Sequence, residues 1–354
     1  MKTEHILVIR FSAMGDVAMT VPVIYSLAKR YPDVRITMLS QKYARPFFEH
    51  MPHNVGFMEA DLKGEYHGVK GLNALYRRLM AKNFTAIADL HSVLRSQYLR
   101  MRFNIDRYKV AHIDKHRSLR RQLTSPTNKR LEQLPTSFQN YADVFAALGY
   151  PIDVEFKSIY PEGKGDISQL PETFRRKTAD ELWIGVAPFA AHKGKIYPQE
   201  KMQQVLDILV EHHPEARIFL FGGGKEEGNT MQQWAERHQQ IENASAQLQG
   251  IHNELILMSH LDMMLSMDSS NMHLASLVGT PVVSVWGATH PFTGFMGWGQ
   301  NPDNAVMIDM PCRPCSIYGN KPCMRGNYPC LTGITPQMIA DRMEIQLLKG
   351  RKEK

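Results

Sequence analysis

The sequence predicts an α/β protein made of two Rossmann-like, doubly wound domains. Short apolar runs alternate with amphipathic helical stretches along most of the chain, which is typical of parallel sheets covered by helices. This alternation comes in two series, separated at 161–171 by a segment rich in Gly, Lys and Asp that has linker composition. At 354 residues the chain is also too long for most single hydrophobic cores.

The first series opens with the apolar run 5–10, whose length and branching predict a buried strand. A turn follows, and Asp16 begins a helix that ends before Tyr31-Pro32. Between 115 and 134 the pattern lapses into basic residues, and we expect an exposed basic loop or mobile helix there. We predict further strands at 35–40, 55–60, 84–90 and 107–113, and further helices at 44–50, 72–82, 93–103 and 138–148.

The second series repeats the alternation and ends in a strand that closes at Gly287. Its predicted elements are the strands 182–187 and 216–221, a triple-glycine turn at 222–224, and helices at 200–212, 229–237 and 254–261. Two Rossmann-like halves joined by a linker predict an active site in the cleft between the halves. We assign 1–163 to the N-terminal domain, 164–335 to the C-terminal domain, and 336–354 to a C-terminal helix.

Composition and charge narrow the classes of function. A hydrophobic content of 43% with 22% charged residues is that of an ordinary soluble protein. The first residues carry no signal-peptide core and no apolar run reaches membrane-spanning length, so we expect a cytoplasmic protein. A net charge of +7 suggests an anionic partner, either a nucleic acid, a phosphorylated substrate or an anionic membrane surface.

The four cysteines, Cys312, Cys315, Cys323 and Cys330, fall together. A cytosolic setting argues against disulfides, whereas Cys-x-x-Cys with two more cysteines nearby is compatible with a structural zinc ion. The second pair lacks the Cys-x-x-Cys spacing, and prolines crowd the segment. We therefore favour reduced thiols that pack a loop, and we predict no metal in the functional site.

The stretch 267–291 organises the second half of the chain. It consists of a polar turn, one amphipathic helix, a Gly-Thr-Pro break and a buried strand. Its turn residues favour a helix N-cap, and the free N–H groups and dipole of a helix N-terminus suit a phosphate. The alternative is a well-capped helix that binds nothing. The candidate phosphate-binding residues here are Asp268, Ser269, Ser270, Asn271 and Met272.

This stretch resembles the C-terminal signature of the ADP-heptose:lipopolysaccharide heptosyltransferases, glycosyltransferase family 9. The matching residues are Asp268-Ser269, His273-Leu274-Ala275, Gly279, Pro281, Gly287 and Thr289. One departure is Ser270, where the family usually has glycine, which adds a Cβ and a hydroxyl where a phosphate would approach. Two further motifs of the family stand in the right order, Gly15-Asp16 after the first strand and Lys195-x-Tyr-Pro in place of Lys-x-Trp-Pro.

Asp16 lies directly after the first strand, at the sheet edge where open α/β folds bind ligands. Position alone predicts a helix N-cap, and a helix N-terminus favours the ionised carboxylate at neutral pH. The resemblance implies that Asp16 is the general base, and the two roles are compatible. We also assign Ser12, Met14 and Gly15 of this turn to the substrate-binding residues.

Two lysines follow the first strand of the second domain. Lysines in a loop are commonly only solvated, but at a strand end Lys193 and Lys195 could neutralise a leaving diphosphate. The resemblance selects Lys195 as the phosphate ligand, with Lys193 assisting.

Other residues of the second domain have weaker assignments. The resemblance places Glu226 or Glu227 beside the nucleoside, against the alternative of exposed acids after a glycine turn. Met258 borders the adenine or packs in the core. For His273 a packed position is favoured over a role as a base.

The basic residues of the first domain, represented by Arg95 and Arg120, form either a solvated surface or a site for an acidic glycolipid near an anionic leaflet. Nucleic acid is not expected, because aromatic residues do not interleave with these runs.

The resemblance implies an inverting glycosyltransferase of the GT-B architecture that moves heptose from ADP-heptose to an acidic lipid A-core acceptor. The N-terminal domain would bind the acceptor and the C-terminal domain the nucleotide sugar, without a cofactor, and the helix 336–354 would cross back to the first domain. We expect peripheral contact with the cytoplasmic face of the inner membrane. The alternatives are a GT-B transferase or epimerase that uses another nucleotide sugar, and a non-catalytic relative that only binds sugar nucleotides.

Overall fold

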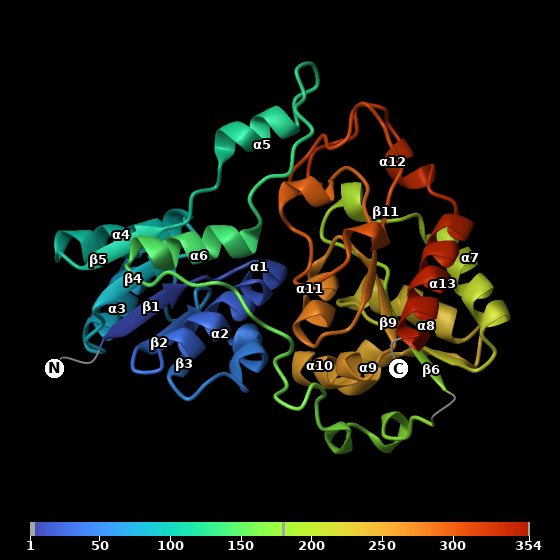
Figure 1. The fold of residues 1–354 in the computed structure, drawn as a ribbon, viewed down its shortest axis with the longest axis horizontal. Coiled ribbons are helices and arrows are strands. Elements are labelled where there is room, and N and C mark those ends of the chain that lie inside the picture. The colour runs from blue at the N-terminus through green and yellow to red at the C-terminus, as the bar shows by residue number, and fades with distance from the viewer. Residues whose placement is uncertain (1–3, 179–180, 353–354) are drawn as a thin grey trace. The chain divides into compact units, whose positions relative to one another are not determined.

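The computed structural model describes residues 4–178 and 181–352 (Figure 1). The chain forms two compact units, and each contains one parallel β-sheet. The first unit runs to Lys115 and includes Pro135–Ile159, and the second consists of His116–Leu134 and the chain from Tyr160 onward. The predicted α/β class with two doubly wound domains is confirmed.

Five parallel strands form the sheet of the first unit, in the order β3-β2-β1-β4-β5. Strand β1 is central and completely buried, because it pairs with β2 on one side and β4 on the other. The strands are β1 (His5–Ile9), β2 (Arg35–Ser40), β3 (Val55–Glu59), β4 (Ala86–Asp89) and β5 (Lys109–His112).

Two pairs of helices cover this sheet. Helix α2 packs against α6, and α3 packs against α4. Right-handed crossovers place the two pairs on opposite faces of the sheet. A core of aliphatic and aromatic side chains from β1, α3 and α4 fills the space between the second pair and the sheet. The helices are α1 (Met14–Ala18), α2 (Thr20–Arg30), α3 (Gly68–Met80), α4 (Leu94–Ile105) and α6 (Ser137–Ala147), with a 3-10 helix η1 (Lys42–Phe48).

Six parallel strands form the sheet of the second unit, in the order β11-β10-β9-β6-β7-β8. Every residue of β6 and β9 is buried, as expected of strands covered on both faces. The strands are β6 (Leu182–Ala187), β7 (Ala216–Leu220), β8 (Ile241–Asn243), β9 (Met263–Met267), β10 (Val282–Val285) and β11 (Ala305–Val306).

The helices of the second unit alternate with these strands, except for α5, which comes earlier in the chain. They are α5 (Arg117–Leu123), α7 (Gln199–His212), α8 (Lys225–Ala235), α9 (Ala244–Leu248), α10 (Ile251–Ser259), α11 (Ser270–Leu277), α12 (Pro329–Thr332) and α13 (Pro336–Lys352). Short 3-10 helices are η2 (Ile167–Gln169), η3 (Glu172–Phe174), η4 (Lys193–Lys195), η5 (Pro291–Thr293) and η6 (Pro302–Asn304). None of the helices in the described part of the chain combines the length and hydropathy that a bilayer crossing requires.

Two segments pack differently from the sequence-based prediction. Residues 116–134, which the prediction includes in the first domain, belong to the second unit, where Lys129 Nζ donates to the carbonyls of Cys312 (3.0 Å) and Pro314 (2.6 Å). Helix α13, predicted to cross back to the first domain, packs on α7 and on β9, β10 and β11 of its own unit. These contacts join residues that are distant in sequence, so local patterns do not reveal them.

Each sheet changes direction once in its strand order. In the first unit this point lies at β1 and β4, and in the second at β6 and β9. In open α/β sheets, ligands bind outside the carboxyl ends of the strands at this switch point. The loops that leave these four strands therefore define where functional side chains should be sought.

Candidate functional site

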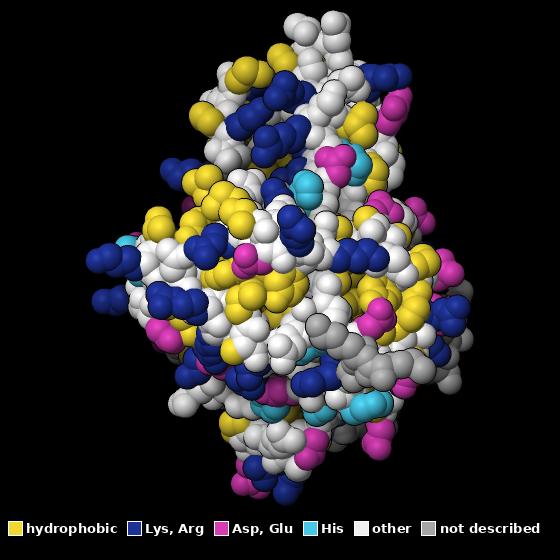
Figure 2. Space-filling model, turned by 90° about the vertical axis from the view of Figure 1, so that its left-hand side faces the viewer, with side chains coloured by type: hydrophobic (Ala, Val, Ile, Leu, Met, Phe, Trp, Pro, Cys, Tyr) yellow, Lys and Arg dark blue, Asp and Glu magenta, His cyan; other side chains and the backbone are white. Residues whose placement is uncertain are grey.

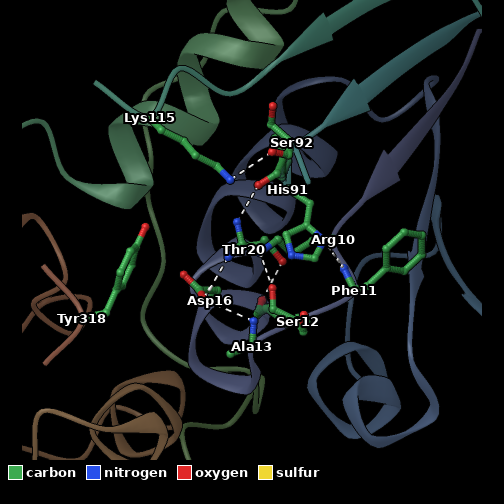
Figure 3. Close-up of polar contacts among 12 residues, drawn as sticks. Arg10, Phe11, Ser12, Ala13, Asp16, Thr20, His91, Ser92, Lys115 and Tyr318 are labelled. Carbon is green, nitrogen blue, oxygen red and sulfur yellow. Dashed lines mark hydrogen bonds and ion pairs between the residues drawn. The ribbon is translucent and has the colours of Figure 1, made fainter. Parts of the chain in front are cut away.

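Asp16 lies in α1, directly after the carboxyl end of β1 (Figure 3). Its Oδ2 atom accepts a hydrogen bond from the backbone N–H of Ala13 (3.2 Å) and forms an ion pair with Arg10 Nη2 (2.9 Å). The Oδ1 atom makes no hydrogen bond within the described residues, and a quarter of the side chain is exposed. One carboxylate oxygen is thus fixed and the other is available to a ligand. The prediction that Asp16 is the helix N-cap is wrong, because Ala13 is the N-cap of α1 and Asp16 lies in the first turn, where it accepts the N–H of Ala13.

Arg10 holds this carboxylate in place. The Arg10 guanidinium is buried at the end of β1, where Nε donates to the Ser12 carbonyl (2.9 Å) and Nη1 to the Leu90 carbonyl (2.7 Å). It therefore ties the loops after β1 and β4 to each other and to Asp16. The sequence analysis did not select Arg10. The available signal was a cation directly after a buried strand and just before the Gly15-Asp16 motif.

The loop after β4 is fixed by a second buried carboxylate. Asp89 Oδ1 accepts the backbone N–H groups of His91 (3.0 Å) and Ser92 (2.8 Å), and Oδ2 pairs with Arg100 (3.3 Å). The His91 ring is buried against Phe11, whose N–H points at Nδ1 (3.4 Å). Burial, together with the nearby positive charge of Arg10, lowers the pKa of His91 to about 3. His91 is therefore neutral at pH 7.

In the second unit, Lys195 lies on η4 after β6, and Asp268 follows β9. Lys195 Nζ forms an ion pair with Asp268 Oδ2 (2.8 Å), and the same oxygen accepts the Thr289 hydroxyl (2.7 Å). Asp268 is buried and Lys195 largely so, whereas Lys193 is exposed. The lysine selected by the sequence is thus the one that is held at the switch point of the sheet.

The loop that carries Lys195 packs closely against two other loops. The Gly194 carbonyl accepts the N–H of Ala288 (2.8 Å), and the Gly194 N–H donates to the Gly319 carbonyl (3.3 Å). A Cβ atom at residue 194 would lie 2.7 Å from the Gly319 oxygen, so this approach requires glycine. Tyr197 is buried and donates to the Ile334 carbonyl (2.9 Å), which makes it an anchor of the loop in the core.

Helix α11 begins beside Asp268, and Ser269 is its N-cap. The sequence predicts that side-chain oxygens cap this helix, but the Ser269 side chain makes no such bond and pairs instead with Ser266 Oγ (3.3 Å). The first-turn N–H groups are consequently left to an outside acceptor. Ser270 and Asn271 are partly exposed, whereas the side chains of Met272 and His273 are buried.

The glycine turn after β7 places the two candidate glutamates at the start of α8. Glu227 Oε2 accepts the backbone N–H of Gly223 (2.8 Å), and Glu226 is exposed. Gly224 has a φ of +80°, which favours glycine. Met258 is fully buried in α10, so of its two sequence-based assignments the structure favours core packing.

The remaining candidates lie in both units. Ser12 and Met14 are partly exposed beside Asp16, and Gly15 is buried. Arg95 is exposed in the first turn of α4, in the first unit. Arg120 belongs to the second unit, where its Nη1 atom donates to the hydroxyl of Tyr318 (2.6 Å).

The cysteine loop is held by polar contacts of a buried cation. Arg313 Nε donates to the Gly287 carbonyl (2.6 Å), and its Nη2 atom to the carbonyls of Trp286 (3.2 Å) and Thr289 (3.0 Å). All four cysteines are free thiols. Within the described residues, no three His, Cys, Asp or Glu side chains lie where they could share a metal ion. The loop therefore orders the end of β10 through Arg313.

Solved glycosyltransferase structures share this fold. A glycosyltransferase family 9 protein from Veillonella parvula superposes with a TM-score of 0.72 at 20% identity, covering 99% of this chain and 98% of that chain. The E. coli heptosyltransferase WaaC, solved with ADP, gives a TM-score of 0.68 at 18% identity, covering 97% and 99%. The chain thus has the GT-B fold of these enzymes. Its two ion pairs, Arg10–Asp16 and Lys195–Asp268, follow the strands at the two sheet switch points.

The sequence profile of glycosyltransferase family 9 (heptosyltransferase) matches residues 72–323, which is more than half of the chain. The chain therefore belongs to glycosyltransferase family 9 and is a glycosyltransferase, as the sequence motifs predicted. Similar curated proteins include lipopolysaccharide core heptosyltransferase OpsX of Haemophilus influenzae (24% identity; 86% of this chain and 84% of that protein). Lipopolysaccharide heptosyltransferase 1 of Campylobacter coli is 22% identical over 80% of this chain and 84% of that protein.

The low pKa of His91 makes the stability of the protein pH-dependent. Between the ordinary value of 6.5 and the folded value of about 3, the unfolded chain takes up a proton that the native state does not. This group therefore lowers the free energy of unfolding by about 2 kcal/mol from pH 7 to pH 5. His91→Asn keeps a hydrogen-bond acceptor for the Phe11 N–H. From pH 7 to pH 5 its free energy of unfolding should therefore fall by about 2 kcal/mol less than that of the wild type, as measured by chemical denaturation at both pH values. The exposed His53→Asn is the control, and an equal loss in wild type and His91→Asn would contradict the assignment.

Proposed function

We propose that this enzyme transfers heptose from ADP-heptose to an acidic lipopolysaccharide inner-core acceptor with inversion at the anomeric carbon. An acceptor hydroxyl attacks the anomeric carbon, the bond from that carbon to the diphosphate oxygen breaks, and ADP leaves. The names of the curated relatives support heptose and lipopolysaccharide as substrates. The observation that carries the proposal is the free Oδ1 atom of Asp16, held at a sheet switch point by Arg10.

Asp16 is proposed as the general base. Its Oδ2 atom is occupied by Arg10 and Ala13, so Oδ1 is the atom that would receive the proton of the acceptor hydroxyl. Arg10 acts as a positioning residue, because three of its nitrogens are fixed by Asp16 and by the carbonyls of the adjoining loops. A carboxylate oriented before the substrate arrives avoids the cost of ordering it during the reaction. Ser12, Met14 and Gly15 would contact the acceptor beside it.

Lys195 and the first turn of α11 are proposed to bind the diphosphate of the donor. Lys195 brings a positive charge that Asp268 holds in place, and the uncapped N–H groups after Ser269 can donate hydrogen bonds to an anion. Both groups stabilise negative charge that develops on the leaving ADP, so we propose that no metal ion is needed. Lys193 would assist from its exposed position, and Glu226 or Glu227 would border the nucleoside.

The acceptor is proposed to be acidic and lipid-linked. Arg95 and Arg120 would contact its phosphates and carboxylates, since guanidinium groups bind both in a bidentate manner. The enzyme would meet this acceptor through peripheral contact with the cytoplasmic face of the inner membrane.

Replacing the proposed base should separate binding from chemistry. Asp16→Asn keeps the shape of the side chain but accepts no proton, so kcat should fall by about 10²- to 10⁴-fold. The affinity for ADP-heptose should change less than about twofold, because the donor contacts lie on the second unit. Transfer is measured as acceptor-dependent ADP release, and affinity by calorimetry.

Asp33→Asn, at an exposed aspartate of the same unit, is the matched control and should leave both quantities unchanged. Activity of Asp16→Asn within fivefold of wild type would show that Asp16 is not the base. Donor binding by the wild type without turnover on any acidic core acceptor would favour a non-catalytic role.

The two lysines should differ in their effect on ADP binding. Lys195→Met removes a buried, charge-assisted contact worth about 1.5–3 kcal/mol, so the Kd for ADP should rise by about 10- to 100-fold. Lys193→Met removes an exposed charge and should raise the Kd less than about threefold. Isothermal titration calorimetry measures both values, and thermal unfolding checks the fold.

The double variant Lys195→Met/Asp268→Asn removes both partners of the ion pair. It should bind ADP as weakly as Lys195→Met, because the cation is still missing. Recovery of wild-type affinity in the double variant would mean that Lys195 only neutralises Asp268, and the assignment of Lys195 as phosphate ligand would fail.

A further inference from the structure

Helix α4 carries an apolar stripe on its outer side. Leu94, Met101 and Ile105 are 85%, 48% and 67% exposed. Their spacing of seven and four residues places them along one line of the helix, and the buried Phe103 lies on the opposite side. A surface helix normally turns a polar face to water. This helix is therefore apolar on both sides, and three exposed aliphatic side chains along one line of a helix are more than single scattered residues.

Positive charges surround this stripe. Helix α3 lies beside α4, because Asn73 Oδ1 accepts hydrogen bonds from the Tyr98 hydroxyl and from Arg102, and the Tyr76 ring packs on Phe103. The exposed cations of the two helices and of the residues that flank them are Lys70, Arg77, Arg78, Lys82, Arg95, Arg107 and Lys109. Arg78 donates to the Tyr66 hydroxyl (2.7 Å), and across residues 4–178 and 181–352 none of the other six forms an ion pair. Figure 2 shows apolar and basic side chains interleaved on the side of the molecule that carries these helices.

The charge of this region accounts for the basic character of the chain. Residues 68–112 contain nine Lys and Arg against two Asp, a net charge of +7, which equals the net charge of the whole protein. Both aspartates are engaged, since Asp89 is buried and paired with Arg100, and Asp106 accepts the Tyr76 hydroxyl. The α3–α4 surface thus combines exposed aliphatic groups with a large excess of unpaired positive charge.

We propose that the α3–α4 surface, defined by Leu94, Met101, Ile105 and the seven cations named above, docks on an anionic phospholipid bilayer. The aliphatic side chains enter the boundary between headgroups and acyl chains, and the lysines and arginines contact the lipid phosphates. This inference rests on the proposed function, in which the acceptor is linked to a lipid. The α3–α4 surface would be the part of the enzyme that brings it to the bilayer holding that acceptor.

Two other occupants fit the surface less well. Single-stranded nucleic acids are bound through aromatic groups that stack on bases, and a duplex bound through its phosphates would leave the aliphatic stripe without an apolar partner. A second copy of the chain would bring two surfaces of like charge together, which is unfavourable. An anionic bilayer satisfies both the aliphatic and the cationic parts.

The position of α4 gives the docking a consequence for the site. The helix begins at the carboxyl edge of the sheet, three residues after His91, and Leu94 is its first residue. That edge also carries Asp16, in α1 after β1. Docking through Leu94 therefore brings the edge with the proposed base toward the lipid surface.

The test is sedimentation of the full-length protein with vesicles. Vesicles of phosphatidylcholine alone are compared with vesicles that also contain phosphatidylglycerol. The wild type should bind the anionic vesicles at least tenfold more tightly, and added salt should weaken this binding. The triple variant Leu94→Gln/Met101→Gln/Ile105→Gln should bind them at least tenfold more weakly, and Lys70→Gln/Arg77→Gln should lose part of the binding and part of the salt dependence.

A matched control exists on α13 of the second unit, where Met338, Ile345 and Leu348 are also exposed. Met338→Gln/Ile345→Gln/Leu348→Gln replaces the same three residue types and should bind like wild type. The proposal is overturned if the α4 triple variant retains binding, if the α13 variant loses it equally, or if neutral vesicles bind as well as anionic ones. It is also overturned if the α4 variant abolishes a dimer, seen by sedimentation velocity, and leaves vesicle binding intact.

Transfer assays separate this inference from the proposed function. With a deacylated core acceptor in solution, the α4 triple variant should have wild-type activity. With the same core presented on lipid A in anionic vesicles, its activity should fall at least tenfold. If wild type transfers heptose to neither acceptor while vesicle binding follows the expected pattern, the proposed function fails and the docking surface stands.

Discussion

The change of direction in each parallel sheet is the constraint on which this structure depends. Ligands of open α/β sheets bind at this point, outside the carboxyl ends of two adjacent strands, and in each unit an ion pair lies in the loops that follow those strands. In the first unit the cation, Arg10, orients a carboxylate, and one oxygen of Asp16 remains for a ligand. In the second unit the carboxylate, Asp268, orients a cation, Lys195. The same fold feature thus presents an acidic group on one unit and a basic group on the other.

Both ion pairs are largely shielded from water. Solvent therefore screens the attraction between their charges less than it would in a surface ion pair. Arg10 and Asp268 are the more buried partners, and each is held by further hydrogen bonds, from Arg10 to the Ser12 and Leu90 carbonyls and from Thr289 to Asp268. Burying a charge is costly unless it is paired and hydrogen-bonded, so the arrangement resists reorganisation. Side chains fixed in this way are oriented before a substrate binds, which is what electrostatic catalysis requires.

Local patterns in the sequence predicted the alternation of strands and helices and the position of Asp16 directly after β1. They marked Arg10 only as a cation directly after a buried strand, and they could not reveal its bond to the Leu90 carbonyl, 80 residues away. The assignment of residues 116–134 to the second unit could not be predicted for the same reason, because Lys129 donates to carbonyls more than 180 residues further along the chain. The N-cap at Ser269 was predicted by residue type, but the Ser269 hydroxyl pairs with Ser266, three residues earlier at the end of β9. The contacts of Arg10 and Lys129 are tertiary, whereas this one is local and residue type alone does not decide which partner the hydroxyl takes.

The serine at position 270 can be interpreted from the same geometry. It is the first residue of α11 and has no positive φ, so the backbone there does not demand glycine. Because the Ser269 hydroxyl turns to Ser266, the start of the helix keeps its N–H groups without a side-chain cap. A partly exposed hydroxyl at Ser270 then adds a donor beside those N–H groups. Because Cα–Cβ bonds tilt toward the N-terminus of a helix, this hydroxyl lies on the side from which an anion would approach, where it can donate to that anion.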